Sequence, residues 1–136
     1  MSFDIYLQRF GAGELATFSR QHFERVFAPH VTKREIAHRC VTLKYPNGGG
    51  GYVYIEDGEE IGGFTVNRPN GDELFNDLFV LMKDVGAVVY WPGEGPCIAV
   101  AEPAIIADLP SDMLEAIGPA VTVASGAEII ETISRS

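Results

Sequence analysis

The sequence predicts an α+β fold, with a mainly antiparallel sheet built from hairpins and helices packed on one face of the sheet. Two observations lead to this fold class. Predicted strands follow one another with short turns between them, as antiparallel neighbours do. The predicted helices carry an apolar stripe along one side, which is typical of a helix that packs on a sheet. The 136 residues fit a single domain, 1–136, that can bury a core without a disulfide or a metal.

The first third of the chain is predicted to contain a strand, a helix and a second strand. Apolar and polar residues alternate over 3–8, which indicates a half-buried strand. Apolar residues at helical spacing over 14–27 predict an amphipathic helix, with His22 as a half-buried histidine on its apolar side. The polar, basic segment 30–39 is interpreted as a short second helical piece, and 41–45 as a strand.

A hairpin follows the glycine run Gly48–Gly51. In its first strand, 52–56, two tyrosines share one face and two aliphatic residues share the other, and the alternation does not decide which face is buried. Asp57-Gly58 predicts a type I′ turn, in which both central residues have positive φ. The return strand, 60–67, contains Gly62-Gly63, which indicates a bulge.

The longest predicted helix lies between Asn70 and Gly86. Asn70 can cap it and Glu73 can reach back in a capping box, while Gly86 suits the left-handed residue at its end. Ser125 and Glu128 repeat the capping pattern before a C-terminal helix. The other elements are strands at 87–91, 97–101 and 121–124, a short helix at 111–117, and the C-terminal helix, which runs to 133.

The net charge and its distribution restrict the kind of partner. The formal net charge is −9, which disfavours nucleic acid because its phosphates repel an acidic surface. Residues 1–45 contain seven Lys/Arg and four Asp/Glu, whereas residues 46–136 contain three and fifteen. An acidic surface attracts a basic protein and speeds its association. The asymmetry also allows a homo-oligomer in which the basic half of one subunit contacts the acidic half of another.

Cysteine usage and the opening residues predict a cytoplasmic protein. Cys40 and Cys97 read as reduced thiols, and the first ten residues lack the basic and apolar regions of a signal peptide. The charge-free stretch 117–127 is interrupted by Gly118 and Pro119 and is too short to span a bilayer. We therefore predict no membrane association.

No stretch carries a complete cofactor, metal or nucleophile motif. The glycine run lacks the Lys and Ser/Thr of a phosphate-binding loop and leads into a strand, so it is interpreted as a flexible hairpin loop. Residues 11–16 fit Gly-x-Gly-x-x-Ala, but the strand before them alternates and no βαβ unit follows. The acids around Asp57 lack calcium-loop spacing, and His38 with Cys40 lacks a second ligand pair for zinc. We predict no cofactor and no metal, while a catalytic site assembled from distant residues stays open.

The candidate contact residues are two tyrosines, the acids that follow them, one arginine and the single tryptophan. The tyrosines would supply contact area and the acids a charged rim. Arg68 is expected to pair internally with a carboxylate, with an anion or partner contact as the alternative. Trp91 fits either core packing or an exposed anchor. The complete set is Tyr52, Tyr54, Glu56, Asp57, Glu59, Glu60, Arg68 and Trp91.

Three stretches resemble a family of short, functionally uncharacterised bacterial cytoplasmic proteins, some of which are regarded as immunity-like. These stretches are SFDIYLQ at 2–8, FTVNRP at 64–69 and YWPG at 90–93. The resemblance implies a stand-alone bacterial domain, and it assigns neither a mechanism nor a site residue.

The sequence as a whole favours a non-enzymatic, acidic protein-binding module, with an immunity-type inhibitor of a basic toxin or nuclease as its most specific form. The alternative is a small-ligand binder or small enzyme, which would need a pocket near Arg68 that includes groups such as His22 or Trp91. Self-association through the oppositely charged halves is a third hypothesis.

Overall fold

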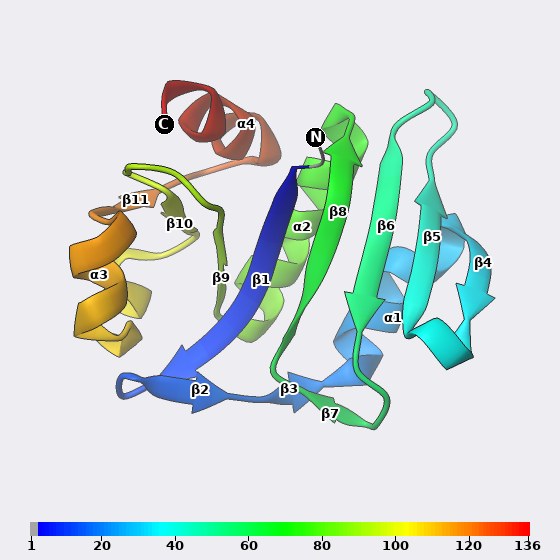
Figure 1. Ribbon diagram of the computed structural model, residues 1–136, viewed down its shortest axis with the longest axis horizontal. Coiled ribbons are helices and arrows are strands. Elements are labelled where there is room, and N and C mark those ends of the chain that lie inside the picture. Colours follow the sequence, from blue (N-terminus) through cyan, green and yellow to red (C-terminus); the bar gives the residue numbers. More distant parts are fainter. Residues whose placement is uncertain (1–2) are drawn as a thin grey trace.

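The computed structural model describes residues 3–136, and these form the predicted α+β fold with a mostly antiparallel sheet (Figure 1). The main sheet contains β1 (Asp4–Gly11), β2 (Glu14–Ala16), β4 (Val31–Glu35), β5 (Cys40–Lys44), β6 (Gly50–Ile55), β8 (Gly63–Asn70), β9 (Ala87–Tyr90), β10 (Ile98–Val100) and β11 (Ala120–Thr122). Their order is β11-β10-β9-β1-β8-β6-β5-β4, and β2 pairs with the end of β1. Within the described residues, the β10–β11 pair is the one parallel pair. A separate two-stranded sheet joins β3 (Phe18–Ser19) to β7 (Glu60–Ile61).

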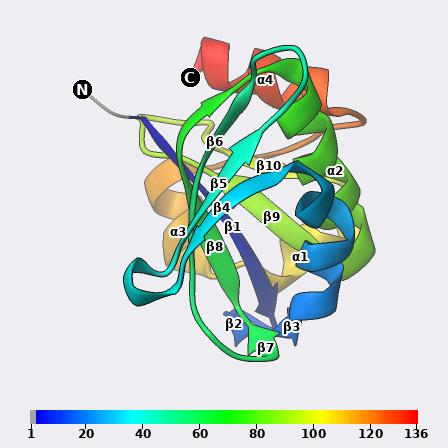
Figure 2. The same ribbon diagram turned by 90° about the vertical axis from the view of Figure 1, so that its right-hand side faces the viewer.

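Three helices cover one face of the main sheet and enclose the larger core. They are α1 (Arg20–Phe27), α2 (Asp72–Val85) and α4 (Gly126–Arg135), and Figure 2 shows them on the same side of the strands. The apolar side of α2, including Leu74, Leu78 and Leu81, packs in one cluster with Ile5 and Val66 of the sheet. Burial of these side chains is the main favourable term for folding.

A smaller helical unit covers the opposite face at one end of the sheet. The 3-10 helix η3 (Pro103–Asp108) and α3 (Ser111–Ile117) pack over β9 and β10. Val88 and Ile98 point into this second core, together with Phe10 and Leu109. Because β9 and β10 are covered on both faces, their residues are almost entirely apolar. The sequence patterns did not predict this second layer.

The rest of that opposite face has no helix over it, and we call this part, on β1, β8, β6 and β5, the open sheet face (Figure 1). Tyr52 and Tyr54 of β6 lie on the open sheet face and are 43% and 47% exposed. Val53 and Ile55 alternate with them and are buried in the larger core. The structure therefore decides which face of this strand is exposed.

The first helix is shorter than predicted, because residues 14–19 are extended. Positive φ at Ala12 and Gly13 reverses the chain, so that β2 pairs with β1 and β3 pairs with β7. Leu15, assigned to the apolar side of a helix, is 76% exposed. The helix instead begins after Ser19, whose hydroxyl accepts a hydrogen bond from the Gln21 N–H at 3.3 Å. Sheet hydrogen bonds outweighed the helical spacing of the side chains.

The prediction of a helical piece at 30–39 is wrong for most of that segment. Val31–Glu35 forms β4, which pairs with β5 at the edge of the sheet, and only Ile36–His38 (η2) makes a 3-10 turn. The apolar residues in this segment are too few for a buried helix face, and pairing with β5 satisfies its backbone groups.

The hairpin turn also differs from the type I′ prediction. Gly58 has positive φ and Asp57 does not, and the connection from β6 to β8 spans seven residues, 56–62. Two of these form β7, which pairs with β3. The register shift lies between Gly50 and Tyr52, not at Gly62-Gly63. The predicted bulge position is therefore wrong.

The glycine run is a site of close backbone contact and not a loose spacer. A Cβ atom on Gly50 would lie 2.0 Å from the Leu43 carbonyl oxygen, and one on Gly49 would lie 2.6 Å from the Asn70 carbonyl oxygen. Both glycines are buried. Glycine is required at Gly49 because it packs against the chain before α2, and at Gly50 because it packs against the backbone of β5.

Two of the three predicted helix ends are confirmed. Gly86 adopts the left-handed conformation after α2, and the Ser125 hydroxyl accepts a hydrogen bond from the Glu128 N–H at 3.3 Å. The predicted Asn70 cap is wrong, since Gly71 occupies the N-cap and no side chain caps α2. Asp72 and the following glutamate still place negative charge in its first turn.

Candidate functional site

Cross-strand pairing brings tyrosines from three strands together on the open sheet face and at its border with β9. Tyr54 is directly opposite Thr65, Thr65 is opposite Tyr6, and Tyr6 is opposite Tyr90. Side chains that are directly opposite on one face of an antiparallel pair lie about 5 Å apart. The four residues therefore form one continuous row across β6, β8, β1 and β9.

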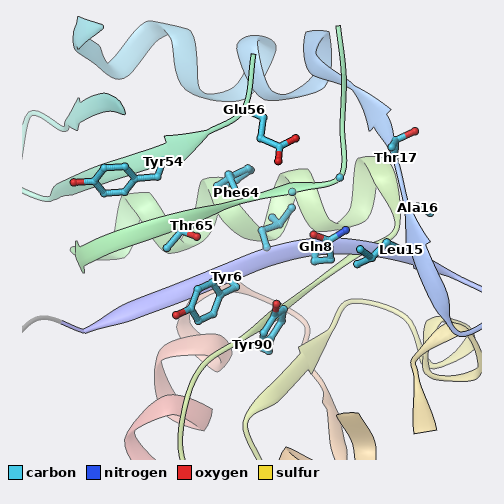
Figure 3. Close-up of a pocket in the computed structure, with 13 residues that line it drawn as sticks. Tyr6, Gln8, Leu15, Ala16, Thr17, Tyr54, Glu56, Phe64, Thr65 and Tyr90 are labelled. Atoms are coloured by element: carbon cyan, nitrogen blue, oxygen red, sulfur yellow. The ribbon is translucent and has the colours of Figure 1, made fainter. Parts of the chain in front are cut away.

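This row borders a cavity of about 500 Å³ on the open sheet face (Figure 3). We call it the tyrosine recess and define it by Tyr6, Gln8, Thr17, Tyr54, Glu56 and Tyr90. The sheet forms its floor, and the segment from β2 to Thr17 forms one wall. Aromatic rings with a few convergent polar groups are typical of a binding site.

Glycine in the sheet explains why the recess exists. Gly63 is directly opposite Gln8, next to the tyrosine row, and Gly62 precedes it. A Cβ atom on Gly63 would lie 2.0 Å from the Leu7 carbonyl oxygen and 2.9 Å from the Gln8 side-chain oxygen. Glycine therefore allows the strands to approach here, and it leaves the floor of the recess without a side chain.

Two of the three tyrosine rings are stacked, and the pKa values of Tyr54 and Tyr90 are raised. The rings of Tyr6 and Tyr90 are stacked, with centroids 5.1 Å apart and planes inclined by 26°. Burial, and then the neighbouring Tyr6, raise the pKa of Tyr90 above its usual range. The Cys40 thiol, directly opposite Tyr54, raises the pKa of Tyr54. The recess therefore presents uncharged rings and hydroxyl groups.

Glu56 contributes an unpaired negative charge to the lining of the same recess. Its backbone carbonyl accepts a hydrogen bond from the Arg20 guanidinium at 2.6 Å, which holds the residue in place. Its side chain points toward the recess (Figure 3). Within residues 3–136, no basic side chain lies within 4.0 Å of its carboxylate.

The three other predicted acids, Asp57, Glu59 and Glu60, do not line the tyrosine recess. Asp57 lies 3.9 Å from the Arg39 guanidinium, and Glu60 accepts a hydrogen bond from the Thr17 hydroxyl at 3.3 Å. Glu59 lines a separate hollow beside Arg20, which Glu60 also lines. All are exposed, so the acids form an extended negative rim and not one cluster.

Arg68 lies at a second hollow, of about 390 Å³, which we call the arginine recess and which Lys44, Tyr52, Asn70 and the glycine run also line. Its backbone is left-handed, with φ of 54°, and its N–H donates to the Phe3 carbonyl at 2.8 Å. The predicted internal ion pair is wrong: within the described chain no carboxylate lies within 4.0 Å of it. Arg68 lies near the C-terminal end of β8, whereas the acids at 56–60 precede the start of that strand.

Trp91 is not an exposed anchor. The ring is 1% exposed, packs in the larger core, and donates a hydrogen bond from Nε1 to the Ser136 hydroxyl at 2.9 Å. His22 is half-buried on α1, as predicted, and its Nδ1 has no hydrogen-bond partner among residues 3–136. Neither residue lines the recess that contains Arg68, so the predicted pocket uniting the three does not form.

Sequence reasoning missed Tyr6, Gln8, Thr17 and Tyr90. The alternation over 3–8 did place Tyr6 and Gln8 on the polar side of their strand, which is the open sheet face. Tyr90 lies within the apolar run 87–91, which shows no alternation, and Thr17 was assigned to a helix. Only strand order shows that these residues are neighbours of Tyr54.

A group of titratable residues lies apart from both recesses. The Tyr45 hydroxyl donates a hydrogen bond to Asp77 Oδ2 at 2.7 Å, and His30 Nε2 lies 3.6 Å from the same oxygen. The His30 and Tyr45 rings are stacked, with centroids 4.0 Å apart. Burial, and then Asp77, hold the pKa of Tyr45 far above its usual range. Tyr45 therefore acts as a hydrogen-bond donor that ties β5 to α2.

Comparison of the chain with known protein families, curated proteins and solved structures finds no match. Across residues 3–136, no three His, Cys, Asp or Glu side chains are grouped as metal ligands. No helix among these residues has the length and apolar character needed to cross a membrane. The candidate functional site is therefore the open sheet face with its two recesses.

Proposed function

We propose that the protein is a non-enzymatic binding module whose open sheet face docks a basic protein. The observation that carries the proposal is the tyrosine row, in which Tyr54 is exposed and Tyr6 and Tyr90 are half-buried, with the unpaired Glu56 beside Tyr54 on the same strand side. Rigid aromatic side chains on strands supply contact area at a low cost in conformational entropy. The acidic rim supplies long-range attraction for a partner of opposite charge.

An immunity-type inhibitor of a basic toxin or nuclease is the most specific form of this proposal. The net charge of −9 would allow the protein to occupy a surface that otherwise engages a polyanion. Cys40 and Cys97 are both buried and free, which supports a location in the reducing cytoplasm. The resemblance to immunity-like proteins points in the same direction.

The proposal is tested by retrieving partners with the immobilised protein from its own host at low salt. A double variant, Tyr54→Ala with Glu56→Gln, is compared with a control, Val80→Ala with Glu115→Gln, whose positions are exposed on α2 and α3. We expect a protein of positive net charge, identified by mass spectrometry, that binds the wild type and the control, elutes with salt, and is lost from the double variant. Calorimetry with the purified partner must reproduce this pattern. Absence of such a partner, or equal binding to the double variant, would contradict the proposal.

A small anionic ligand at the arginine recess is the second candidate function. Arg68 and Lys44 line this recess, and neither has a carboxylate within 4.0 Å in the described residues. Thermal shift measurements with phosphorylated and carboxylated metabolites test it. A rise in Tm that disappears in Arg68→Gln supports an anion site, whereas a rise retained in that variant excludes this recess.

A further inference from the structure

We propose that the tyrosine recess receives the guanidinium of an arginine side chain from the basic partner, with Glu56 as its counter-ion. This inference rests on the proposed function and specifies the group that the open sheet face recognises. In this proposal the tyrosine recess binds a cation. The arginine recess, across β6, is instead lined by the basic side chains of Lys44 and Arg68. The two hollows on the open sheet face therefore have opposite preferences for charge.

The aromatic lining favours a cation in the recess. Tyr6, Tyr90 and Tyr54 border it, and the first two form a stack in which the rings hold each other in place. The face of an aromatic ring attracts a cation within about 6 Å, with a gain of about 0.5–2 kcal/mol that increases as water is excluded. A neutral phenol keeps this property, and the raised pKa values of Tyr54 and Tyr90 further favour the neutral form.

The polar groups of the recess are suited to hydrogen-bond donors. The Gln8 amide nitrogen donates to the Arg9 carbonyl at 3.0 Å, so its side-chain oxygen is left to accept. The Glu56 carboxylate has no basic partner in residues 3–136, although Arg20 holds its backbone. Tyrosine and threonine hydroxyls add further acceptors. An entering group therefore meets one full negative charge and several neutral acceptors.

A guanidinium fits this combination better than an ammonium. It is planar and can stack on a tyrosine ring, and its fixed fork of N–H groups can donate to a carboxylate and a neighbouring acceptor at once. An ammonium is more strongly hydrated and loses more on leaving water.

The existing basic residues of the protein do not fill the recess. Arg9, on β1 beside Gln8, donates instead to the Val85 carbonyl at 3.0 Å and the Thr17 carbonyl at 2.7 Å. Arg20 donates to the Glu56 carbonyl from the side of α1. Neither side chain lines the cavity. The negative charge of Glu56 thus stays available to a group from another molecule.

The test is an NMR titration of the full-length protein with three small amides: Nα-acetylarginine amide, Nα-acetyllysine amide and Nα-acetylcitrulline amide. Citrulline has nearly the shape of arginine and no charge. We expect saturable shifts of the Tyr6, Tyr54 and Tyr90 ring signals with arginine, binding weaker by several-fold with lysine, and weaker by about tenfold or more with citrulline. Equal affinity for citrulline would overturn the cation assignment, and equal affinity for lysine would overturn the guanidinium.

Variants locate the site. Glu56→Gln keeps the size of the side chain and should weaken arginine binding by about fivefold to tenfold, whereas Glu115→Gln on α3 should leave it unchanged. Tyr54→Phe retains the ring and most of the affinity, and Tyr54→Ala loses it. If Glu56→Gln and Tyr54→Ala both bind the arginine amide as tightly as the wild type does, the amide binds outside the tyrosine recess and the proposal is wrong.

The outcomes also separate this inference from the proposed function. Arginine amide bound in the recess, with no basic protein retained by the open sheet face, would contradict the proposed function alone. A basic partner that requires the open sheet face, with no binding of arginine amide at the recess, would contradict this inference alone.

Discussion

Tyr45 shows how one hydroxyl connects the two layers of the fold. It lies just after β5, is buried, and donates its hydrogen bond to Asp77 on α2. Burial and the nearby carboxylate both disfavour the phenolate, so the pKa of Tyr45 is raised in the folded state. A tyrosine whose folded pKa is raised contributes stability that is complete below its unfolded pKa of about 10 and is lost as the pH rises above it.

Tyr45→Phe should therefore lower the free energy of unfolding by about 1–2 kcal/mol at pH 8, because a hydrogen bond to a charged acceptor is lost. The difference between wild type and variant should shrink near pH 11, where only the wild type must keep a buried phenol protonated. Urea unfolding at both pH values measures this. Tyr52→Phe, at an exposed position, serves as the control and should change stability by less than about 0.5 kcal/mol. An unchanged difference at the two pH values would contradict the expectation.

Gly50 is a second residue whose identity the packing requires. Gly50→Ala places a Cβ atom 2.0 Å from the Leu43 carbonyl oxygen, on a backbone with φ of 150°. We expect a loss of about 2 kcal/mol or more in denaturant unfolding. Gly48→Ala is the matched control, since its φ is also positive but no atom lies within 4 Å of the added carbon. A similar loss at the two positions would mean that backbone strain alone, and not the contact, decides the cost.

Single elements were predictable where local hydrogen bonds define them. Helix α4 begins at a capping box: the Ser125 hydroxyl accepts from the Glu128 N–H, and the Glu128 carboxylate accepts from the Ala124 N–H at 3.3 Å. The helix packs Ile129 into the larger core beside Trp91. The capping box therefore fixes the start of a helix that covers one end of the larger core.

Ser125→Ala should cost about 1 kcal/mol of stability, because the Glu128 N–H loses its acceptor. Ser134→Ala, in the last turn of α4, removes a hydroxyl that bonds only the nearby Glu131 carbonyl at 2.8 Å and should cost less than about 0.5 kcal/mol. Thermal unfolding followed by circular dichroism compares the two. Equal shifts in Tm would contradict the role of the cap.

At the scale of the whole molecule, several basic residues of the first third take part in ion pairs. Much of the basic charge of the first third is paired within the molecule. Arg34 lies against Glu24, Lys33 is 3.2 Å from Glu35, and Arg39 is 3.9 Å from Asp57. The Arg34 contact lowers the pKa of Glu24. Exposed pairs of this kind contribute little to stability, but they engage basic side chains that could otherwise contact another subunit.

We therefore expect no salt-dependent self-association. Sedimentation velocity of the pure protein at about 0.02 M and 0.5 M salt, where the screening length differs several-fold, should give the same mass. A larger species at low salt that dissociates at high salt would contradict this expectation and would support the homo-oligomer instead.

The sequence by itself determined the fold class, most strand positions, the ends of α2 and α4 marked by Gly86 and Ser125, and the alternation that sets Tyr52 and Tyr54 apart from Val53 and Ile55. These features depend on neighbours in the chain, whose spacing a local pattern records. The tertiary structure alone decided that the tyrosines are exposed, that Tyr6 and Tyr90 join Tyr54, that Arg68 is unpaired, and that Trp91 is buried. The reason is physical: strand order and the placement of α3 depend on contacts between distant segments, and no local spacing encodes which strand becomes the neighbour of another.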